Sequence, residues 1–305
     1  MNETNRQILP PGLWVVATPI GNLGDFTPRA RWALEHATWV LCEDTRRTAH
    51  LFSALGFSVG KGRLSRFDAH ADPKTVEKWI EVLQRGDSIA LVTDAGTPSV
   101  SDPGSVLVAA AHEGGVRVTP VPGVSAVSTL LSVAGFIGAS FNFGGFFPRK
   151  QSEQVRVLQA ASVSSLSQVY VWFESPHRVQ EALSVIEGFV LEHCPDASVV
   201  AGKELTKLHE KIFRGSATSV KNHVDQEMTS EGILGEWCIG IEFPRRREEA
   251  ISGVDGDEAN KAPWFLALSC LIEEGVSLSR AVKRVSQAFG VSKNRVYEQS
   301  LKIGK

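Results

Sequence analysis

The sequence has no large excess of positive charge and few cysteines. Its 305 residues hold 32 Lys and Arg against 34 Asp and Glu, a formal net charge of −2. That balance excludes an overall basic field for holding a nucleic acid, so any RNA or DNA contact has to rest on local patches. The cysteines Cys42, Cys194, Cys238 and Cys270 lie far apart and form no metal-type pair. We expect them to be buried thiols in a reducing cytosol.

Export and membrane signals are also missing. Residues 1–11 are polar and end in proline, without the apolar core of a signal peptide. Residues 118–148 carry no charge and are longer than a membrane span requires, but prolines and glycines interrupt them. We expect a buried helix at 125–134 followed by a buried strand. The protein is predicted to be cytoplasmic and without membrane contact.

Familiar ligand motifs are absent as well. No Gly-x-Gly-x-x-Gly occurs, which leaves a Rossmann dinucleotide site unsupported. Residues 56–61 approach a phosphate loop, but the spacing is one residue short and Gly62 stands where Ser or Thr is needed. Residues 123–127 resemble a nucleophile elbow without its second glycine. The histidines do not pair at metal-ligand spacing, so no metal site is expected.

The first half of the chain alternates apolar strands with amphipathic helices, which predicts a mostly parallel sheet with helices on both faces. The strands are expected at 13–17, 39–42, 89–92 and 116–119, and the helices at 27–36, 45–55, 74–85 and 104–112. We assign residues 1–12 to an N-terminal tail and residues 13–138 to an N-terminal α/β domain.

A second α/β domain is expected over residues 139–243. Its strands are predicted at 168–173, 197–202, 210–213 and 236–243, with a helix at 176–186. Because most of these strands lack long helices between them, we expect a mixed sheet.

Residues 244–263 are a polar linker without apolar periodicity, and residues 264–305 form a helical tail. Gly290 ends one helix and Ser292 caps the next, which is a helix-turn-helix-like spacing. Short helical tails of this kind more often serve packing or dimer contacts than DNA reading.

The most informative segment is the loop after the strand at 89–92. It offers the carboxylates of Asp94 and Asp102, and Gly96 allows close approach of its backbone. Loops at the carboxyl ends of strands in open α/β sheets bind small ligands. The plainer interpretation is a strand-to-helix turn with Asp102 as a helix cap.

Other loops at strand ends share this character. Residues 42–48 place two acids beside two arginines, which suits phosphate binding or simply a helix start with acids at its N-terminus. Residues 17–25 and 120–126 are rich in glycine and proline, and Ser125 caps a helix or marks a ligand-binding helix start. Residues 173–178 and 203–207 hold acids beside bases, either as structural ion pairs or as the wall of an interdomain cleft.

Six segments, ATPIGNLGD, CEDTRRT, VTDAGTPSVSDPG, PVPGVSA, FESPHR and KELTKLHE, resemble in order and spacing the tetrapyrrole (corrin/porphyrin) methylase superfamily. Within it they resemble the ribosomal RNA small subunit methyltransferase I group, from residue 13 to about 243, and the tail is also similar. The resemblance implies two α/β domains with S-adenosylmethionine in the cleft between them, and a homodimer. It implies methylation of the ribose 2′-oxygen of a cytidine in the decoding centre of 16S rRNA, with the small ribosomal subunit as partner and no DNA.

The resemblance also implies a cofactor site that suits the chemistry of S-adenosylmethionine. A sulfonium, an amino-acid tail, a ribose and an adenine need carboxylates or carbonyls, backbone donors and an apolar slot. The residues that it implies are Pro19, Gly21, Asp94, Gly96, Thr97, Val100, Ser125, Ala126, Phe173, Glu174, Phe213, Arg214, Gly235 and Glu236.

A ribose hydroxyl is a very weak acid, so its proton must be removed or shared as the methyl group transfers in line. Our hypothesis is that one loop orients the nucleotide while a second acts on the hydroxyl. The orienting residues are Glu43, Asp44 and Arg46, and the acting residues are Lys203 and Glu204. The RNA contacts that we expect, each with a solvated-surface alternative, are Arg47, His70, Arg149, Lys150, His177, Arg178 and Lys207.

Two segments depart from the group's pattern. The group's His-x-His-Asn-Glu is DAHAD here, around His70, and its Lys-Gly-Glu is Leu234-Gly235-Glu236. The first change makes the substrate contacts that the resemblance implies near His70 uncertain. The second removes one possible basic contact. The alternatives are a methylase of tetrapyrroles or of a modified protein histidine (diphthine-type), and a catalytically silent RNA-binding module. The Arg-rich loop and the helical tail favour RNA.

Overall fold

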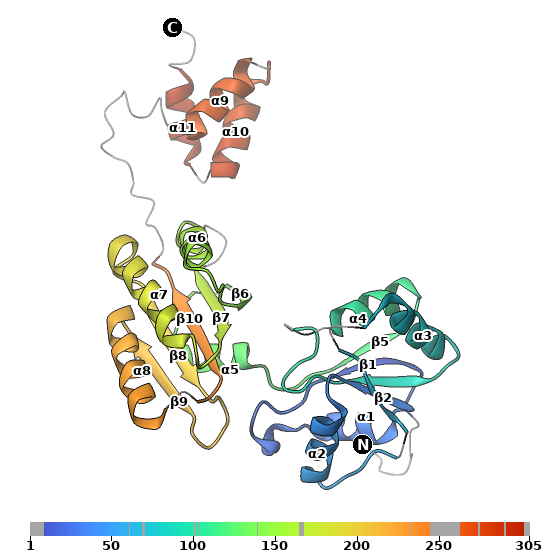
Figure 1. Ribbon diagram of the computed structural model, residues 1–305. Helices are drawn as coiled ribbons and strands as arrows, with labels where there is room; N and C mark the ends of the chain where they lie inside the picture. Colours follow the sequence, from blue (N-terminus) through green and yellow to red (C-terminus); the bar gives the residue numbers. More distant parts are fainter. Residues whose placement is uncertain are drawn as a thin grey trace. The chain divides into compact units, whose positions relative to one another are not determined.

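The computed structural model describes residues 9–60, 62–68, 71–100, 102, 104–138, 140–164, 168–232, 234–244, 263–273, 275–289 and 291–301. The chain divides into two compact units, residues 1–245 and 246–305. The first unit contains two β-sheets with their helices, and the second is helical (Figure 1). Among the described residues, no helix is both long and apolar enough to cross a bilayer.

The first sheet has the strand order β3-β2-β4-β1-β5, and every pair in it is parallel. Its strands are β1 (Gly12–Val16), β2 (Trp39–Cys42), β3 (Leu64–Arg66), β4 (Ser88–Leu91) and β5 (Val118–Val121). The predicted alternation of strands and helices is confirmed, with β3 as an additional strand. Because the strands are parallel, their carboxyl ends meet at one edge of the sheet.

Helices cover both faces of this sheet, as the sequence predicts. They are α1 (Pro28–His36), α2 (Thr45–Ala54), α3 (Pro73–Gln84) and α4 (Gly104–Glu113), with a short 3₁₀ turn, η1 (Leu23–Asp25), before α1. Successive strand residues point to opposite faces. Val40 and Ala90 therefore pack with α1 and α2, whereas Leu41 and Ile89 pack with α3 and α4.

Side-chain caps explain where three of these helices begin. Thr27 accepts a hydrogen bond from the Ala30 amide before Pro28, and Asp72 accepts one from the Thr75 amide. Asp44 does the same at the start of α2. Caps of this kind are each worth about 1 kcal/mol.

The second sheet has the order β6-β7-β10-β8-β9 and is mixed, as predicted. Strand β6 pairs with β7 in parallel, and the other pairs are antiparallel. Its strands are β6 (Phe141–Phe146), β7 (Val169–Glu174), β8 (Ser198–Lys203), β9 (Lys211–Gly215) and β10 (Trp237–Glu242).

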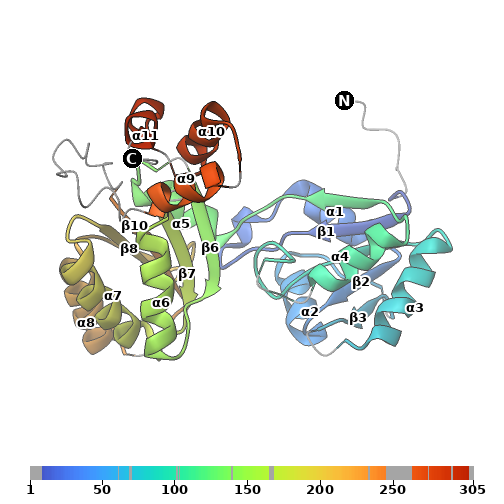
Figure 2. The same cartoon turned by 90° about the horizontal axis from the view of Figure 1, so that it is seen from above.

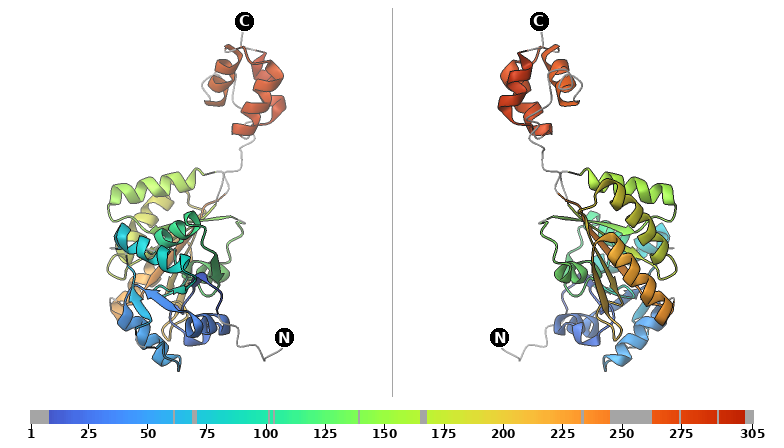
Figure 3. Two further views of the ribbon diagram at one scale, coloured as in Figure 1. Left: turned by 90° about the vertical axis from the view of Figure 1, so that its right-hand side faces the viewer. Right: turned by 90° about the vertical axis from the view of Figure 1, so that its left-hand side faces the viewer.

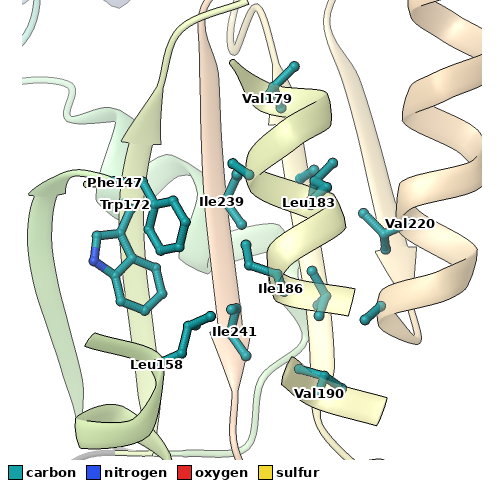
Figure 4. Close-up of a cluster of buried hydrophobic side chains, with 14 of the residues drawn as sticks. Phe147, Leu158, Trp172, Val179, Leu183, Ile186, Val190, Val220, Ile239 and Ile241 are labelled. Atoms are coloured by element: carbon teal, nitrogen blue, oxygen red, sulfur yellow. The ribbon is translucent and has the colours of Figure 1, made fainter. Parts of the chain in front are cut away.

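Three helices cover one face of the second sheet: α6 (Gln151–Ser162), α7 (Val179–His193) and α8 (Ala217–Glu231). Figure 3 shows α7 and α8 side by side across this face, and Figure 4 shows the apolar side chains that they bury against the strands. The sequence predicts α7 but neither α6 nor α8. Gln and Ser are frequent in α6 and Ser and Thr in α8, and the apolar side chains that α8 buries are few: Ala217, Val220, Val224 and Met228.

Helix α5 (Ala126–Ala134) covers the opposite face of the second sheet (Figure 2). Its Val127 and Leu130 are buried against Val171 and Val200. The chain thus reaches the second sheet at the start of α5, whereas the sequence interpretation kept this segment in the first domain.

The strand after α5 was predicted to be buried, and this prediction is wrong. Strand β6 is an edge strand whose Phe141 and Phe146 are 54% and 59% exposed. Its pairing with β7 is irregular between Phe143 and Phe146. Lack of charge does not distinguish an edge strand from a central one, because both carry apolar side chains.

The second unit contains α9 (Pro263–Glu273), α10 (Leu278–Phe289) and α11 (Lys293–Ser300). The three helices share a small core that includes Trp264, Leu268 and Val285. Ser292 accepts a hydrogen bond from the Arg295 amide and so caps α11, as predicted. Gly290 and most of the predicted linker, residues 245–262, lie outside the described residues.

Candidate functional site

The carboxyl ends of β1, β2 and β4 are tied together by polar contacts. Glu43, after β2, accepts hydrogen bonds from the Thr93 hydroxyl and, at 3.2 Å, from the Asp94 amide. Thr18, after β1, exchanges main-chain hydrogen bonds of 2.9 and 3.1 Å with Gly96. Glu43 therefore holds the loop after β4 in place.

The predicted nucleotide-orienting residues Asp44 and Arg46 pair with each other. The Asp44 carboxylate caps α2 and lies 3.3 Å from Arg46 Nη2. The side-chain and main-chain hydrogen bonds from Arg46 lower the pKa of Asp44 to about 2. The plainer interpretation of this loop, an acid at a helix start, thus describes Asp44, while the Arg46 side chain is 90% exposed.

The two carboxylate oxygens of Asp94 differ in their hydrogen bonding. Its Oδ2 accepts a hydrogen bond from Arg47 Nη1 at 3.0 Å. Its Oδ1 is buried and, within the described residues, has no hydrogen-bond partner. A buried acceptor without a donor is costly to the fold, and it is the kind of group that a ligand donor or cation satisfies.

The loop after β4 packs closely on the loops after β1 and β5. Gly96 has φ +82°, and a Cβ there would lie 3.3 Å from Ile20 Cγ2. The Thr97 hydroxyl donates to the Val124 carbonyl at 3.1 Å. Asp102 accepts from the amides of Ser99 and Gly104, so it shapes the loop from within. The three loops together make a closely packed main-chain surface.

The remaining cofactor candidates of the first sheet border this surface. Pro19 is buried, Val100 is exposed, and a Cβ on Gly21 would overlap the Lys207 side chain. Ser125 stands at the N-cap of α5 without a side-chain cap bond. Ala126, half-buried, begins that helix.

The second domain contains an open pocket of about 740 Å³. Its lining residues come from the ends of β7, β8 and β10 and include Pro176, Lys203, Glu204, His209, Leu234, Gly235 and Glu236. The predicted groups that act on the hydroxyl, Lys203 and Glu204, thus lie in the wall of one pocket.

Lys203 is buried in an ion-paired cluster. Its Nζ donates to Glu227 Oε1 at 2.8 Å, and Lys211 Nζ donates to Glu227 Oε2 at 2.7 Å. The side chains of Lys203 and Glu227 are 3% and 8% exposed. Sequence reasoning missed Glu227 and Lys211, because α8 was not predicted and the pairing spans 24 residues.

Glu204 is held in a left-handed backbone conformation at φ +50°. Its Oε1 accepts from Lys207 Nζ and from the Glu236 amide, both at 2.8 Å. Burial raises the pKa of Glu204, but these hydrogen bonds outweigh it and leave the pKa below its ordinary value. A Cβ on Gly235 would lie 2.8 Å from Glu204 Cγ, so only glycine fits beside this carboxylate.

Glu174, at the end of β7, is a second buried carboxylate that has one oxygen without a hydrogen-bond partner among the described residues. Its Oε1 accepts from the Ser175 amide at 2.6 Å and lies 2.5 Å from Arg178 Nη2. Its Oε2 has no partner among the described residues. Burial raises the pKa of Glu174 above its ordinary value. Arg178 is thus engaged by a carboxylate in this structure.

Other predicted site residues have structural partners or lie at the surface. Phe213 stacks against His223 and Trp237 on the face that α8 covers. Arg214 donates to the carbonyls of Ala134 and Gly135 and so caps the end of α5.

Of the predicted RNA contacts, Lys150 lies 3.7 Å from Glu153, and Arg149 and His177 are exposed. His70 lies outside the described residues. In the described part of the chain, no group of three or more His, Cys, Asp or Glu is placed to hold a metal.

Comparison with known proteins agrees with this architecture. The family model of the tetrapyrrole (corrin/porphyrin) methylases matches residues 12–221. The chain is 34% identical over 288 residues to the ribosomal RNA small subunit methyltransferase I of Xylella fastidiosa, covering 94% of this chain and 98% of the relative. It is 34% identical over 302 residues to that of Mesorhizobium japonicum, covering 99% and 95%.

Among solved structures, a diphthine synthase superposes with a TM-score of 0.54 at 16% identity, over 74% of this chain and 88% of that one. This likeness concerns the fold alone. The chain therefore belongs to the tetrapyrrole (corrin/porphyrin) methylase family, in the group of ribosomal RNA small subunit methyltransferase I, and is a methyltransferase.

Proposed function

We propose that this chain transfers a methyl group from S-adenosylmethionine to the ribose 2′-oxygen of a cytidine in the decoding centre of 16S rRNA. Likeness to methyltransferases of small-subunit rRNA over nearly the whole chain supports the substrate class. The geometric observation that supports the reaction most strongly is the buried Asp94 Oδ1. Among the described residues it has no hydrogen-bond partner, and it lies at the edge where the strand-end loops meet.

The acceptor groups present fit S-adenosylmethionine. Asp94 Oδ1 and Glu174 Oε2 are buried acceptors without partners among the described residues, which suits a cofactor with a positive charge and donor hydroxyl and amino groups. Gly96 keeps the backbone beside Ile20 free of a side chain. When bound, the cofactor supplies an electrophilic methyl group on a positively charged sulfur.

The chain's own residues then orient the acceptor and govern its proton. Glu43 fixes the Asp94 amide, so it positions the loop. Glu204, with its lowered pKa, stays ionised at neutral pH and accepts a hydrogen bond from the ribose hydroxyl. Lys203, whose ammonium group is buried against Glu227, lines the same pocket, and positive charge there stabilises a developing alkoxide.

The test uses the purified chain, labelled S-adenosylmethionine and small ribosomal subunits from a strain with its own methyltransferase gene deleted. Nuclease digestion and mass spectrometry of the product identify the modified nucleoside. We expect 2′-O-methylated cytidine in 16S rRNA, and loss of turnover with retained cofactor binding in Lys203→Ala and Glu204→Ala. Methylation of a base, or full turnover in both variants, contradicts the assignment.

We also propose that the chain acts in the cytoplasm as a homodimer. Support for the dimer comes from large apolar side chains exposed on α5, on β6 and on the segment between them, which would be buried by a second copy of the chain. These are Val133, Ile137, Phe141 and Phe146, of which Ile137 is 93% exposed. Sedimentation of the wild type and of Phe146→Glu tests it: the wild type is expected to be a dimer and the variant a monomer.

A further inference from the structure

The second compact unit carries a basic surface of its own. Between Leu278 and Leu301 there are five Lys or Arg and one acidic residue, Glu298, in a chain whose formal net charge is −2. The basic residues are Arg280, Lys283, Arg284, Lys293 and Arg295. A chain without an overall basic field binds RNA through such local patches.

Three of these residues form one stripe on α10. Arg280, Lys283 and Arg284 are spaced i, i+3 and i+4, which places them on one face of the helix, and all three are exposed. The opposite face, with Val282 and Val285, is buried in the core of the tail. We call Arg280, Lys283 and Arg284 the basic stripe.

Within the described residues of the tail, no carboxylate neutralises the basic stripe. Among the described residues, none of its three members pairs with a carboxylate. Like charges at i and i+4 on a helix repel each other and lower its stability. An anionic partner outside the chain relieves that repulsion, and the regular spacing of RNA phosphates matches a row of positive charges.

The start of α11 adds groups suited to the same partner. Ser292 caps the helix, so its N-terminal end is well formed and its dipole favours a phosphate there. Lys293 and Asn294 are exposed in the first turn. Tyr297 is 50% exposed and offers a ring against which an unpaired base can stack.

We propose that the second unit binds the phosphate backbone of RNA through the basic stripe and the start of α11. It thereby holds the small-subunit RNA while the α/β domains methylate it. This inference rests on the proposed function for the identity of the RNA. A protein partner fits less well, because the cores of protein interfaces are depleted of lysine and of charge in general.

The test compares full-length variants binding to a 16S rRNA transcript at several KCl concentrations. Arg280→Gln/Lys283→Gln/Arg284→Gln is expected to raise Kd roughly tenfold at low salt. It is also expected to reduce the slope of log K against log[KCl] by about 2, because phosphate contacts release counterions. The matched control Lys74→Gln/Arg117→Gln/Arg156→Gln removes the same charge from exposed positions on the α/β domains and is expected to keep the wild-type slope.

Two further measurements separate a lost contact from a damaged fold. Arg280→Lys/Arg284→Lys keeps the charge and is expected to keep the slope. Affinity for S-adenosylmethionine and kcat at saturating RNA are expected to stay at wild-type values in the stripe variant, while KM for RNA rises.

Three outcomes overturn the inference: no RNA binding by the wild type, an unchanged Kd and slope in the stripe variant, or a change of oligomeric state with an unchanged slope. If the wild type binds RNA through the stripe and transfers no methyl group to it, the proposed function fails while this inference stands.

Discussion

Glu227 on α8 binds the buried ammonium group of Lys203 at 2.8 Å, and its other oxygen binds Lys211. The Lys203–Glu227 ion pair connects α8, which covers one face of the second sheet, with the wall of the pocket at the ends of the strands. Burial of both partners makes the contact consequential, because a buried charge is stable only while it is paired.

We predict that Glu227→Gln destabilises the protein by about 3–5 kcal/mol, since it removes the buried carboxylate that pairs with the Lys203 ammonium group. Urea unfolding of the two proteins measures the difference. The matched control is Asp225→Asn on the same helix, which breaks the more exposed ion pair with Lys221 and is expected to cost less than about 1 kcal/mol. Equal losses in the two variants would refute the structural importance of the buried pair.

Asp94→Asn is predicted to weaken binding of S-adenosylmethionine by about 10- to 100-fold, the worth of a hydrogen bond to a charged group. Isothermal calorimetry measures the affinity. Asp87→Asn is the control, because Asp87 precedes the amino end of the same strand, β4. If the two variants bind the cofactor alike, Asp94 does not contact it.

Gly96→Ala and Gly56→Ala compare two glycines with positive φ. At Gly56, with φ +75°, a Cβ meets nothing within 4 Å, so alanine is expected to cost only the left-handed strain of about 1–2 kcal/mol. At Gly96 the Cβ also meets Ile20, so we expect a larger loss of stability and weaker cofactor binding. Thermal unfolding measures the loss of stability, and calorimetry measures the affinity for the cofactor. If Gly96→Ala binds the cofactor as tightly as the wild type, the backbone at Gly96 does not contact it.

The pKa of Asp44, lowered to about 2 from 3.8, predicts a pH-dependent contribution to stability. Because the folded pKa lies below the unfolded one, the ionised carboxylate stabilises the fold above pH 3.8, and this contribution is lost as the pH falls toward 2. The difference in unfolding free energy between the wild type and Asp44→Asn is therefore expected to shrink over that window. A constant difference from pH 6 to pH 2 would show that Asp44 is not responsible.

Local patterns were sufficient to predict most of the first sheet, and β2 begins and ends where its apolar run does. They also predicted the strand-end loops, because glycine, proline and acids follow each apolar run. The contact between Lys203 and Glu227 was beyond such reasoning, since it depends on two distant segments and on a helix with few apolar residues. The edge position of β6 was missed for a related reason: it depends on which strands are neighbours, not on the composition of the strand.

One carboxylate oxygen of Asp94 accepts a hydrogen bond from Arg47, and the other has no partner among the described residues. Arg47 itself is 75% exposed, so a polyanion that draws its guanidinium away leaves Asp94 with more unbalanced negative charge. A cation at Asp94 then binds more tightly, and thermodynamic linkage requires that it strengthen the hold of Arg47 on the polyanion by the same factor. If, as proposed, the cofactor binds at Asp94 and RNA at Arg47, this one carboxylate couples the occupancy of the two sites.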